Sequence, residues 1–352
     1  MGAIGAGWWA TTNHFPLLAA SPDVELVALY GPDAGQLAAV GTQFPFQHTT
    51  TDADEFFSLG LDAVVIASPH HTHHVHAARA LAASLAVLIE KPMTLTAADA
   101  WDLERLATDN AAPLLVAYGW NYLPFLEQAA GMLADPGIGE IELVTVRMAS
   151  PTKDFFSSAA TATVPIQWAP QLAGPNPATW QTPGQGGGYA HGQLTHAAGL
   201  LFWLTGLRAS NVMARSAGPG ANVDLYDVAL VEFTSGALGC LSGAATLPDD
   251  EKFQLDLQLY GSEGVFLIDV ERERVELRRH DGIRLSLDVP PGAGSYSCDE
   301  PVQRFIQLAL GRDVPNNSSA NVGARSVELI EALEKSAGSA GVPAHVDLRL
   351  VL

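Results

Sequence analysis

The sequence predicts an α/β protein: an N-terminal doubly wound parallel sheet of the Rossmann type, followed by an α+β domain with a large, mostly antiparallel open sheet. Three observations support this fold class. Buried-strand patterns alternate with helical patterns in the first third of the chain. A series of strand-like runs with short turns fills much of the second half. The 352 residues exceed a typical single domain, so we expect domains at 1–120 and 121–352.

The first domain begins with a short apolar stretch, a glycine-containing loop and a helical pattern. Buried-strand patterns follow, separated by helical patterns, at 24–30, 61–68, 86–92 and 113–120. Thr96 is a suitable N-cap for the helix expected at 96–110, and Asp99 stands three residues later. Strands that alternate with helices predict a parallel sheet.

The second domain opens with a strand at 141–150. A stretch rich in Ala, Thr, Pro, Gly and Gln at 157–188 lacks periodicity and indicates a long loop system. A helix is expected at 192–206, and strands with short turns such as Asp281-Gly282 then indicate an antiparallel meander. A terminal helix at about 322–338 is expected to pack back toward the first domain.

The composition disfavours several classes of protein. The 38 acidic and 18 basic residues leave a net charge of -20, so neither nucleic acid nor an anionic membrane surface is an expected partner. No apolar run approaches the roughly 18 residues of a membrane helix, and the N-terminus has no signal-peptide pattern. Cys240 and Cys298 are the only cysteines, which fits a reducing cytoplasm. We expect a cytoplasmic protein with a small-molecule substrate.

The glycine loop carries the strongest chemical signal. Gly5, Gly7 and Ala10 form a G-x-G-x-x-A pattern between a strand and a helix, with Trp8 and Trp9 inside it. The first glycine allows a tight turn, the second lets the backbone approach a pyrophosphate, and the small third residue lets helix and strand pack closely. The helix N-terminus then faces the phosphates. The loop predicts a dinucleotide cofactor.

The end of the second strand bears on the choice between NAD and NADP. An acidic residue usually holds the ribose hydroxyls there. Gly31 occupies the tip of the strand, and Asp33 follows two residues later. No Arg or Lys stands nearby to hold a 2′-phosphate. Asp33 therefore favours NAD over NADP, although the sequence leaves both open.

With these motifs in place, the chain resembles the Gfo/Idh/MocA oxidoreductase family over nearly its whole length. The resemblance rests on GAGWWA, SPHHTHHVHAARAL, EKPMTLT, AYGWNYLP and GGGYAHGQLTH, in family order. It implies a Rossmann domain that binds NAD or NADP, and a second domain whose open sheet covers the nicotinamide. It also implies reversible oxidation of a hydroxyl on a sugar, sugar derivative or inositol, and a homodimer or homotetramer built through the C-terminal sheet.

The segment SPHHTHHVH holds five of the eleven histidines. In the family a Ser/Thr-Pro follows the third strand and a His lies four residues after the Pro, which here are Ser68, Pro69 and His73. The resemblance implies cofactor contacts from Ser68, Pro69, His70 and His73. We expect no metal, because the histidines crowd one loop and helix start without a Cys or carboxylate nearby.

Glu90, Lys91 and Pro92 form the most specific family motif and are expected beside the cofactor. Oxidation of an alcohol needs a group that accepts the hydroxyl proton. Lys91 is the first candidate, since a desolvated lysine beside a cationic nicotinamide has a lowered pKa; its alternative role is an ion pair with Glu90 or a contact to the cofactor ribose. His196 matches a family histidine and is the second candidate, its alternative being a core residue.

Gly192 is a departure from the family, because an aspartate is usual at this position. Gln193 and His191 are close in sequence, but Gln193 cannot accept a proton. Three interpretations stay open: Lys91 and His196 suffice, His191 contributes, or catalysis is weakened.

The substrate side is expected to include Tyr118, Trp120 and Asn121, together with Lys91 and the residues around His196. Relatives often carry an Arg at Trp120 or Asn121, so its absence argues against an anionic substrate, and aromatic and amide groups suit a polyol or sugar ring. The complete set of expected substrate contacts is Lys91, Tyr118, Trp120, Asn121, His191, Gln193 and His196. Weaker candidates from the long loop system are Asp154, Trp168, Asn176 and Trp180.

Three functions remain in view. The first is an NAD(P)-dependent dehydrogenase or reductase acting on a sugar or inositol. The second is an NAD-dependent glycosidase or lyase that oxidises a ring carbon transiently, without net cofactor turnover. The third is a cofactor-binding regulatory or scaffold protein without catalysis, which the presence of Lys91 and His196 argues against.

Overall fold

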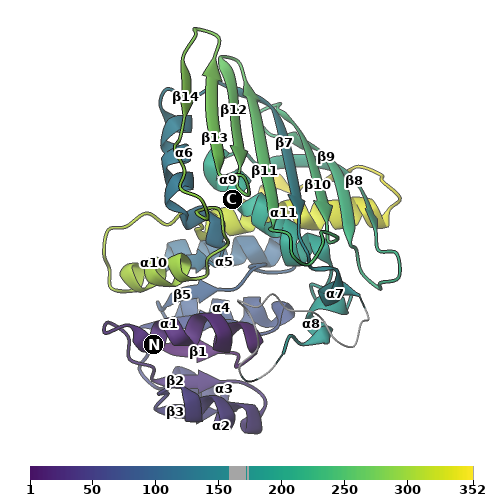
Figure 1. The fold of residues 1–352 in the computed structure, drawn as a ribbon. Coiled ribbons are helices and arrows are strands. Elements are labelled where there is room, and N and C mark those ends of the chain that lie inside the picture. Colours follow the sequence, from purple (N-terminus) through teal and green to yellow (C-terminus); the bar gives the residue numbers. More distant parts are fainter. Residues whose placement is uncertain (158–171, 173, 352) are drawn as a thin grey trace.

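The computed structural model describes residues 1–157, 172 and 174–351, and it contains two sheets (Figure 1). The first is a six-stranded parallel sheet in the order β3-β2-β1-β4-β5-β6. Its strands are β1 Gly2–Ile4, β2 Ala28–Tyr30, β3 His48–Thr50, β4 Ala63–Ile66, β5 Ala86–Ile89 and β6 Leu114–Val116. This doubly wound parallel sheet confirms the predicted fold of the N-terminal half. All four residues of β4 and of β5 are buried, as the continuous apolar runs indicated.

Helices connect these strands on both sides of the sheet. They are η1 Ala10–His14 (a π-helix), α1 Phe15–Ala20, α2 Ala34–Gln43, α3 Ala53–Phe57, η2 His70–Thr72, α4 His73–Ala82 and α5 Ala97–Asp109. Thr96 caps α5 as predicted, since its hydroxyl accepts a hydrogen bond from the backbone N–H of Asp99 over 3.1 Å. Strand β3 escaped prediction because two of its three residues are exposed, so it has no buried pattern.

The second sheet has nine strands in the order β14-β13-β12-β11-β7-β10-β9-β8-β15. The strands are β7 Ile141–Ala149, β8 Ala209–Ala217, β9 Tyr226–Phe233, β10 Leu238–Ala244, β11 Gln254–Gly261, β12 Gly264–Asp269, β13 Arg274–Arg279, β14 Arg284–Ser286 and β15 Ala344–His345. The expected meander is incomplete: β7 lies between two antiparallel runs and pairs in parallel with β10. The sheet is therefore large and mostly antiparallel, as predicted.

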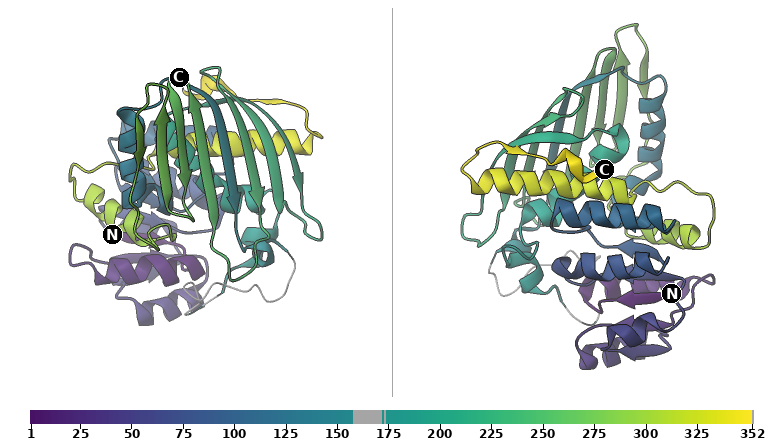
Figure 2. Two further views of the ribbon diagram at one scale, coloured as in Figure 1. Left: turned by 45° about the horizontal axis from the view of Figure 1, so that its top comes forward. Right: turned by 180° about the vertical axis from the view of Figure 1, so that it is seen from behind.

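Further helices pack on the inner face of this sheet, join the two halves or, like α10, pack on the parallel sheet. They are η3 Gly119–Tyr122, α6 Pro124–Ala134, α7 Lys153–Phe156, α8 Pro177–Gln181, η5 Ala190–Leu194 (a π-helix), α9 Thr195–Thr205, α10 Asp299–Ala309, α11 Ala320–Gly338 and η6 Leu348–Val351. Helix α11 runs beside α5, and Glu328 of α11 accepts hydrogen bonds from Trp101 of α5 and from Arg208 (Figure 2). This buried ion pair fixes the two halves against each other. Among the described residues, no helix is long and apolar enough to cross a bilayer.

Candidate active site

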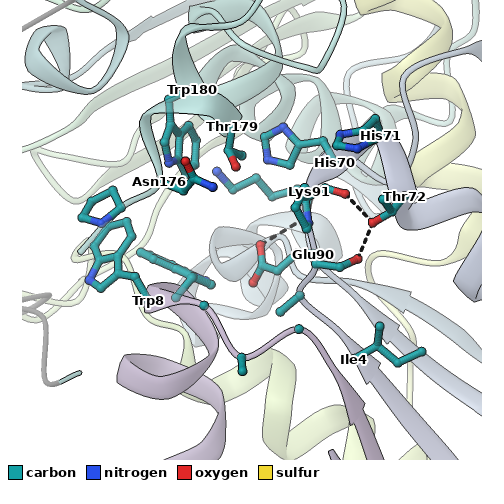
Figure 3. A pocket seen from close by; sticks show the side chains of 18 of the residues that line it. Ile4, Trp8, His70, His71, Thr72, Glu90, Lys91, Asn176, Thr179 and Trp180 are labelled. Atoms are coloured by element: carbon teal, nitrogen blue, oxygen red, sulfur yellow. Dashed lines mark hydrogen bonds between the residues drawn. The ribbon is translucent and has the colours of Figure 1, made fainter. Parts of the chain in front are cut away.

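A cavity of about 630 Å³ opens between the carboxyl ends of the parallel strands and the second sheet (Figure 3). Ligands in open α/β sheets bind at this edge. The predicted site residues that line it are Gly5, Gly7, Trp8, Trp9, Ser68, Pro69, His70, Glu90, Lys91, Trp120, Gln193 and His196. The predicted residues that lie outside its lining are Ala10, Asp33, His73, Pro92, Tyr118, Asn121 and His191. The glycine loop and both candidate catalytic residues thus meet in one space.

The glycine loop has the geometry that a pyrophosphate requires. Gly5 has a φ of +97°, and a Cβ there would lie 2.6 Å from the carbonyl oxygen of Ala67, so only glycine fits. A Cβ on Gly7 would meet nothing within 4 Å, which leaves open space above the loop. Ala10 is fully buried behind it, as close packing of helix and strand demands. The loop therefore fits a dinucleotide.

The ribose end of the cavity carries no carboxylate. Asp33 caps α2 instead, because its Oδ1 accepts from the backbone N–H groups of Gly35 and Gln36 over 2.8 and 3.0 Å. Other residues that the sequence did not single out line this end: Tyr30, Gly31, Pro32, Gln36, Thr72 and His76. Burial, with the charges of His73 and Arg79, lowers the pKa of His76 to about 4, so its ring is neutral at physiological pH.

The histidine-rich segment is divided among different roles. His70 lines the cavity, and its Nδ1 lies 3.1 Å from the carbonyl oxygen of Gly186. His73 lies behind the wall, with its ring nitrogens 2.9 Å from the carbonyl oxygens of Pro92 and Ser68. It thereby joins the loops that follow β4 and β5. Among the described residues, no group of three or more His, Cys, Asp or Glu is placed to hold a metal ion.

Among the described residues, Glu90 and Lys91 are the only acidic and basic ones, histidines aside, that line the cavity. His14 Nε2 donates to Glu90 Oε1 over 2.7 Å, a partner that sequence reasoning missed. Burial raises the pKa of Glu90, but the hydrogen bond and charge of His14, with the charge of Lys91, outweigh it and lower the pKa overall. Glu90 is thus a buried carboxylate with a fixed partner.

Lys91 is only 6% exposed, and its Nζ donates to the carbonyl oxygen of Gly192 over 2.7 Å. The Lys91-Pro92 peptide bond is cis. Burial lowers the pKa of Lys91 to about 8, although the charges of Glu90 and Cys298 oppose the shift. Figure 3 shows the amine between Glu90 on one side and Trp180 on the other. An amine with this pKa can exchange a proton near neutral pH.

His196 reaches the cavity from the first turn of α9. It is 4% exposed, and its ring packs against those of Trp120 and Tyr296, with centroids 5.1 and 5.3 Å away. Burial, and then the charge of Lys91, lower its pKa well below the usual value. Its Nδ1 has no hydrogen-bond partner among the described residues. His196 is therefore a neutral imidazole facing the cavity.

The space of the family aspartate at Gly192 is filled by aromatic rings. A Cβ on Gly192 would lie 2.7 Å from Phe156 Cζ and 3.4 Å from Trp180 Cζ3. The backbone carbonyl of Gly192 binds Lys91 in this chain. The site therefore has no room for an aspartate side chain at position 192 unless Phe156 moves.

Aromatic side chains form most of the wall on the side of the second domain. Trp120 packs against Tyr296 and Phe253, with ring centroids 4.6 and 5.8 Å apart. Trp8 of the glycine loop stacks on Phe155 of α7 at 5.7 Å, and Phe155 contacts Trp180. These six rings leave little polar surface besides Gln193, Thr152, Asn176 and Thr179.

Tyr296 had no sequence signal, because it lies far along the chain in an irregular segment. That segment crosses η3 so closely that a Cβ on Gly119 would lie 2.2 Å from the carbonyl oxygen of Ser297. Of the weaker candidates, Asn176 and Trp180 line the cavity and Asp154 does not. Trp168 lies outside the described residues.

Three residues expected on the substrate side have structural contacts. Tyr118 donates or accepts a hydrogen bond with Thr195 over 3.0 Å. Asn121 Nδ2 donates to the carbonyl oxygens of Gly199 and Asn317. His191 Nδ1 lies 2.9 Å from Glu334 Oε1 on α11. These three side chains therefore make contacts within the protein and do not line the cavity.

Fold and cavity together define the class of the protein: a dinucleotide-binding oxidoreductase with a Rossmann domain and a sheet-based second domain. Residues 1–118 match the family description "Oxidoreductase family, NAD-binding Rossmann fold", and residues 126–267 match "GFO/IDH/MocA C-terminal domain". The chain belongs to the Gfo/Idh/MocA family, which confirms the resemblance seen in the motifs.

Relatives of this chain include named dehydrogenases and reductases. It is 28% identical over 151 residues to inositol 2-dehydrogenase of Rhizobium meliloti (strain 1021), covering 43% of this chain and 45% of that protein. It is 24% identical over 346 residues to dTDP-3,4-didehydro-2,6-dideoxy-alpha-D-glucose 3-reductase of Streptomyces antibioticus, covering 95% and 96%. Several curated relatives are matched over only 40% to 50% of their length.

The fold is also shared with solved structures. Levoglucosan dehydrogenase in complex with NADH and levoglucosan superposes with a TM-score of 0.73 over 98% of each chain, at 18% identity. At this identity the similarity concerns the fold alone.

Proposed function

We propose that the protein is an NAD(P)-dependent dehydrogenase that interconverts a hydroxyl and a keto group on an uncharged sugar, sugar derivative or inositol. One observation carries the proposal: the open glycine loop, the amine of Lys91 and the neutral imidazole of His196 face the same cavity. A cofactor laid along the loop brings its nicotinamide toward the amine, and the remaining space suits a ring of sugar size.

Gly5 and Gly7 would hold the pyrophosphate, with Trp8, Ser68 and Pro69 around it. The bound nicotinamide supplies hydride acceptance and donation. In the oxidative direction, neutral Lys91 Nζ leaves the carbonyl of Gly192 and accepts the proton of the substrate hydroxyl. In the reverse direction, protonated Lys91 returns that proton to the nascent alkoxide. His196 accepts a hydrogen bond from a neighbouring hydroxyl of the substrate and so orients the ring.

NAD is the favoured cofactor. No Lys or Arg of the described structure lines the ribose end of the cavity, so none of these residues offsets the charge of a 2′-phosphate. His76 is neutral at physiological pH because of its low pKa. Asp33 is engaged in capping α2, so the preference rests on the absence of a cation in the lining and not on a carboxylate contact.

An uncharged substrate follows from the charges of the lining. Among the described residues of the lining, Lys91 is the only Lys or Arg, and the charge of buried Glu90 acts on its amine. The sequence of the segment 158–171 adds no charged residue. A carboxylate or phosphate would lose its hydration without gaining a cation of its own. The aromatic rings suit the C–H face of a sugar ring, and Gln193, Asn176 and Thr179 offer hydrogen bonds.

Cofactor titration followed by tryptophan fluorescence tests the proposal, because Trp8 and Trp9 lie in the glycine loop. We expect saturable binding, tighter for NAD than for NADP, and NADH formation with a neutral sugar or inositol. Cofactor that copurifies without net NADH formation would instead favour transient ring oxidation. No binding of either cofactor to folded protein would overturn the dehydrogenase and favour a protein without catalysis.

We also propose a homo-oligomer built through the outer face of the second sheet. Met213, Val228, Leu230 and Leu238 are each about half exposed there, and Met213 and Leu230 are cross-strand partners. Such an apolar face is typical of a subunit interface. Leu230→Arg should reduce the molar mass measured by light scattering, and an already monomeric wild type would contradict the assembly.

A further inference from the structure

Asp224 lies against the backbone of the glycine-rich segment that precedes η5. Its Oδ2 accepts from the N–H of Ala190 over 2.7 Å, and its carbonyl accepts from the N–H of Tyr189 over 3.1 Å. Gly188 has a φ of +107°, and a Cβ there would lie 1.9 Å from Asp224 Oδ1. The glycine is therefore required for the carboxylate to approach the chain.

This contact anchors the start of a helix that supplies the site. Ala190 opens η5, and the N-cap residue Tyr189 makes no side-chain capping bond. Helix starts need acceptors for their free N–H groups and favour negative charge. Asp224 provides both from a separate segment. One turn later, the Gly192 carbonyl binds Lys91, and His196 follows in α9.

A second carboxyl group stands behind the first. Asp227, at the start of β9, is 1% exposed, and its Oδ1 accepts from the hydroxyl of Ser216 over 2.6 Å. No N–H or hydroxyl group among the described residues donates a hydrogen bond to its Oδ2. Burial, and then the charge of Asp224, raise the pKa of Asp227 well above its usual value. Two such close carboxyl groups do not both ionise.

Other titratable groups face the pair. Glu334 of α11 adds negative charge near Asp227, and its Oε1 lies 2.9 Å from Nδ1 of His191 in η5. The phenol of Tyr189, whose pKa burial raises to about 13, stays neutral. Within the described structure, the charge of Glu334 thus favours retention of a proton on Asp227.

We propose that Asp224 and Asp227 share one proton and act as positioning residues that hold the start of η5. The shared proton leaves one negative charge on Asp224, which binds Ala190 N–H and keeps Gly192 and His196 in place beside Lys91. Release of the proton puts two negative charges side by side in a buried space and weakens this anchor. The role in turnover rests on the proposed function, whereas the anchor and its proton do not.

Two substitutions of Asp224 test the anchor. Asp224→Ala should lower kcat about tenfold or more, because a hydrogen bond to a charged acceptor is lost. Asp224→Asn keeps an acceptor oxygen for Ala190 N–H and should remain within about threefold of wild type. Cofactor affinity should stay within about twofold in both, because the glycine loop is untouched. Asp256→Asn on β11, away from the loop, is the matched control.

Amide hydrogen exchange reads the anchor directly. Exchange across 190–196 should accelerate in Asp224→Ala and stay unchanged in the Asp256→Asn control. Unchanged kcat together with unchanged exchange in Asp224→Ala would overturn the positioning role.

The shared proton is tested by unfolding of the cofactor-free protein at different pH values. Asp227 keeps its proton in the folded state above the usual carboxyl pKa of 3.8, so its contribution to stability falls as pH rises from about 4 toward the raised pKa. Asp227→Asn mimics the protonated form and removes this loss. The free energy of unfolding of Asp227→Asn should therefore rise relative to that of the wild type as the pH increases.

If the free energy of unfolding varied with pH in the same way in the wild type and in Asp227→Asn, the shared proton would be wrong. This measurement needs neither cofactor nor substrate. A wild type that binds no cofactor would therefore defeat the proposed function while leaving the test of the carboxyl pair intact.

Discussion

The two walls of the cavity differ in what they contribute. The wall from the parallel sheet carries the charged pair of the lining, and each member has a fixed partner: His14 for Glu90, and the Gly192 carbonyl for Lys91. The wall from the second domain is mostly aromatic rings packed edge to face, such as Trp120 on Tyr296. In the proposed enzyme, the charged wall would therefore serve proton transfer and cofactor binding, and the aromatic wall would serve the fit of the substrate.

Removing the amine of Lys91 from the wall of the parallel sheet should have the largest effect on turnover. Lys91→Met keeps the length of the side chain and should lower kcat by about 10²–10⁴-fold, the range for loss of a general acid-base group. Cofactor affinity, measured by tryptophan fluorescence, should change little. Lys252→Met, at an exposed position, is the control. Turnover that survives Lys91→Met would place proton transfer elsewhere.

The pH dependence of turnover sharpens the same assignment. Alcohol oxidation requires neutral Lys91, whose pKa is lowered to about 8. For oxidation, kcat/KM should rise about tenfold per pH unit below pH 8 and level off above it. For ketone reduction, which needs the protonated amine, it should be flat below pH 8 and fall above. An identical limb in Lys91→Met would assign this ionisation to another group.

Filling the glycine loop should separate binding from stability. Gly7→Val adds a side chain into open space, so the folded protein should keep its stability. The side chain occupies the position of the pyrophosphate, and we expect cofactor affinity to fall by about 1–3 kcal/mol, roughly 5- to 150-fold. Gly131→Val, which also meets open space but lies on α6, controls for the change of residue type. Full affinity in Gly7→Val would move the cofactor away from this loop.

Restoring the family aspartate at position 192 tests the packing of the second-domain wall. Gly192→Asp forces a Cβ against Phe156 and should cost about 1–3 kcal/mol in the free energy of unfolding, measured with urea. Adding Phe156→Ala should make the pair less destabilising than the sum of the single changes, because it opens the space. A stable and more active Gly192→Asp would show that the space is not filled.

A smaller change on the same wall should affect substrate binding alone. Tyr296→Leu removes one ring beside His196, a loss of about 0.5–1.5 kcal/mol. We expect KM for the sugar to rise about 2- to 12-fold, with kcat nearly unchanged. Tyr260→Leu, on the exposed face of β11, is the control. A fall in kcat without a change in KM would place Tyr296 with the chemistry of the first wall.

The sequence predicted the first wall better than the second for a physical reason. A glycine loop and a Lys-Pro turn are local features: Gly5 and Gly7 are recognised within one short stretch of the chain, and Lys91 within the Glu90-Lys91-Pro92 turn. The second wall is assembled from distant segments. Phe253 and Tyr296 reach the cavity through sheet topology and a crossing at Gly119, which leave no periodic pattern.

For the fold too, the sequence predicted the elements with a local pattern and missed those that depend on distant contacts. Buried strands such as β4 and β5 stand out as apolar runs, whereas β3 is polar and exposed. The parallel pairing of β7 with β10 depends on contacts far apart in sequence, so a run of short turns suggested a simple meander. Asp33 was expected at the ribose, but capping α2 uses the same carboxylate.

The contact between Glu90 and Lys91 has a consequence for charge balance during turnover. Glu90 keeps one negative charge in a buried site. In the proposed oxidation, a bound oxidised nicotinamide would offset the charge of Glu90 while Lys91 is neutral. After proton transfer, the amine of Lys91 would offset the same carboxylate. Glu90 would therefore face one positive charge on both sides of the proposed reaction.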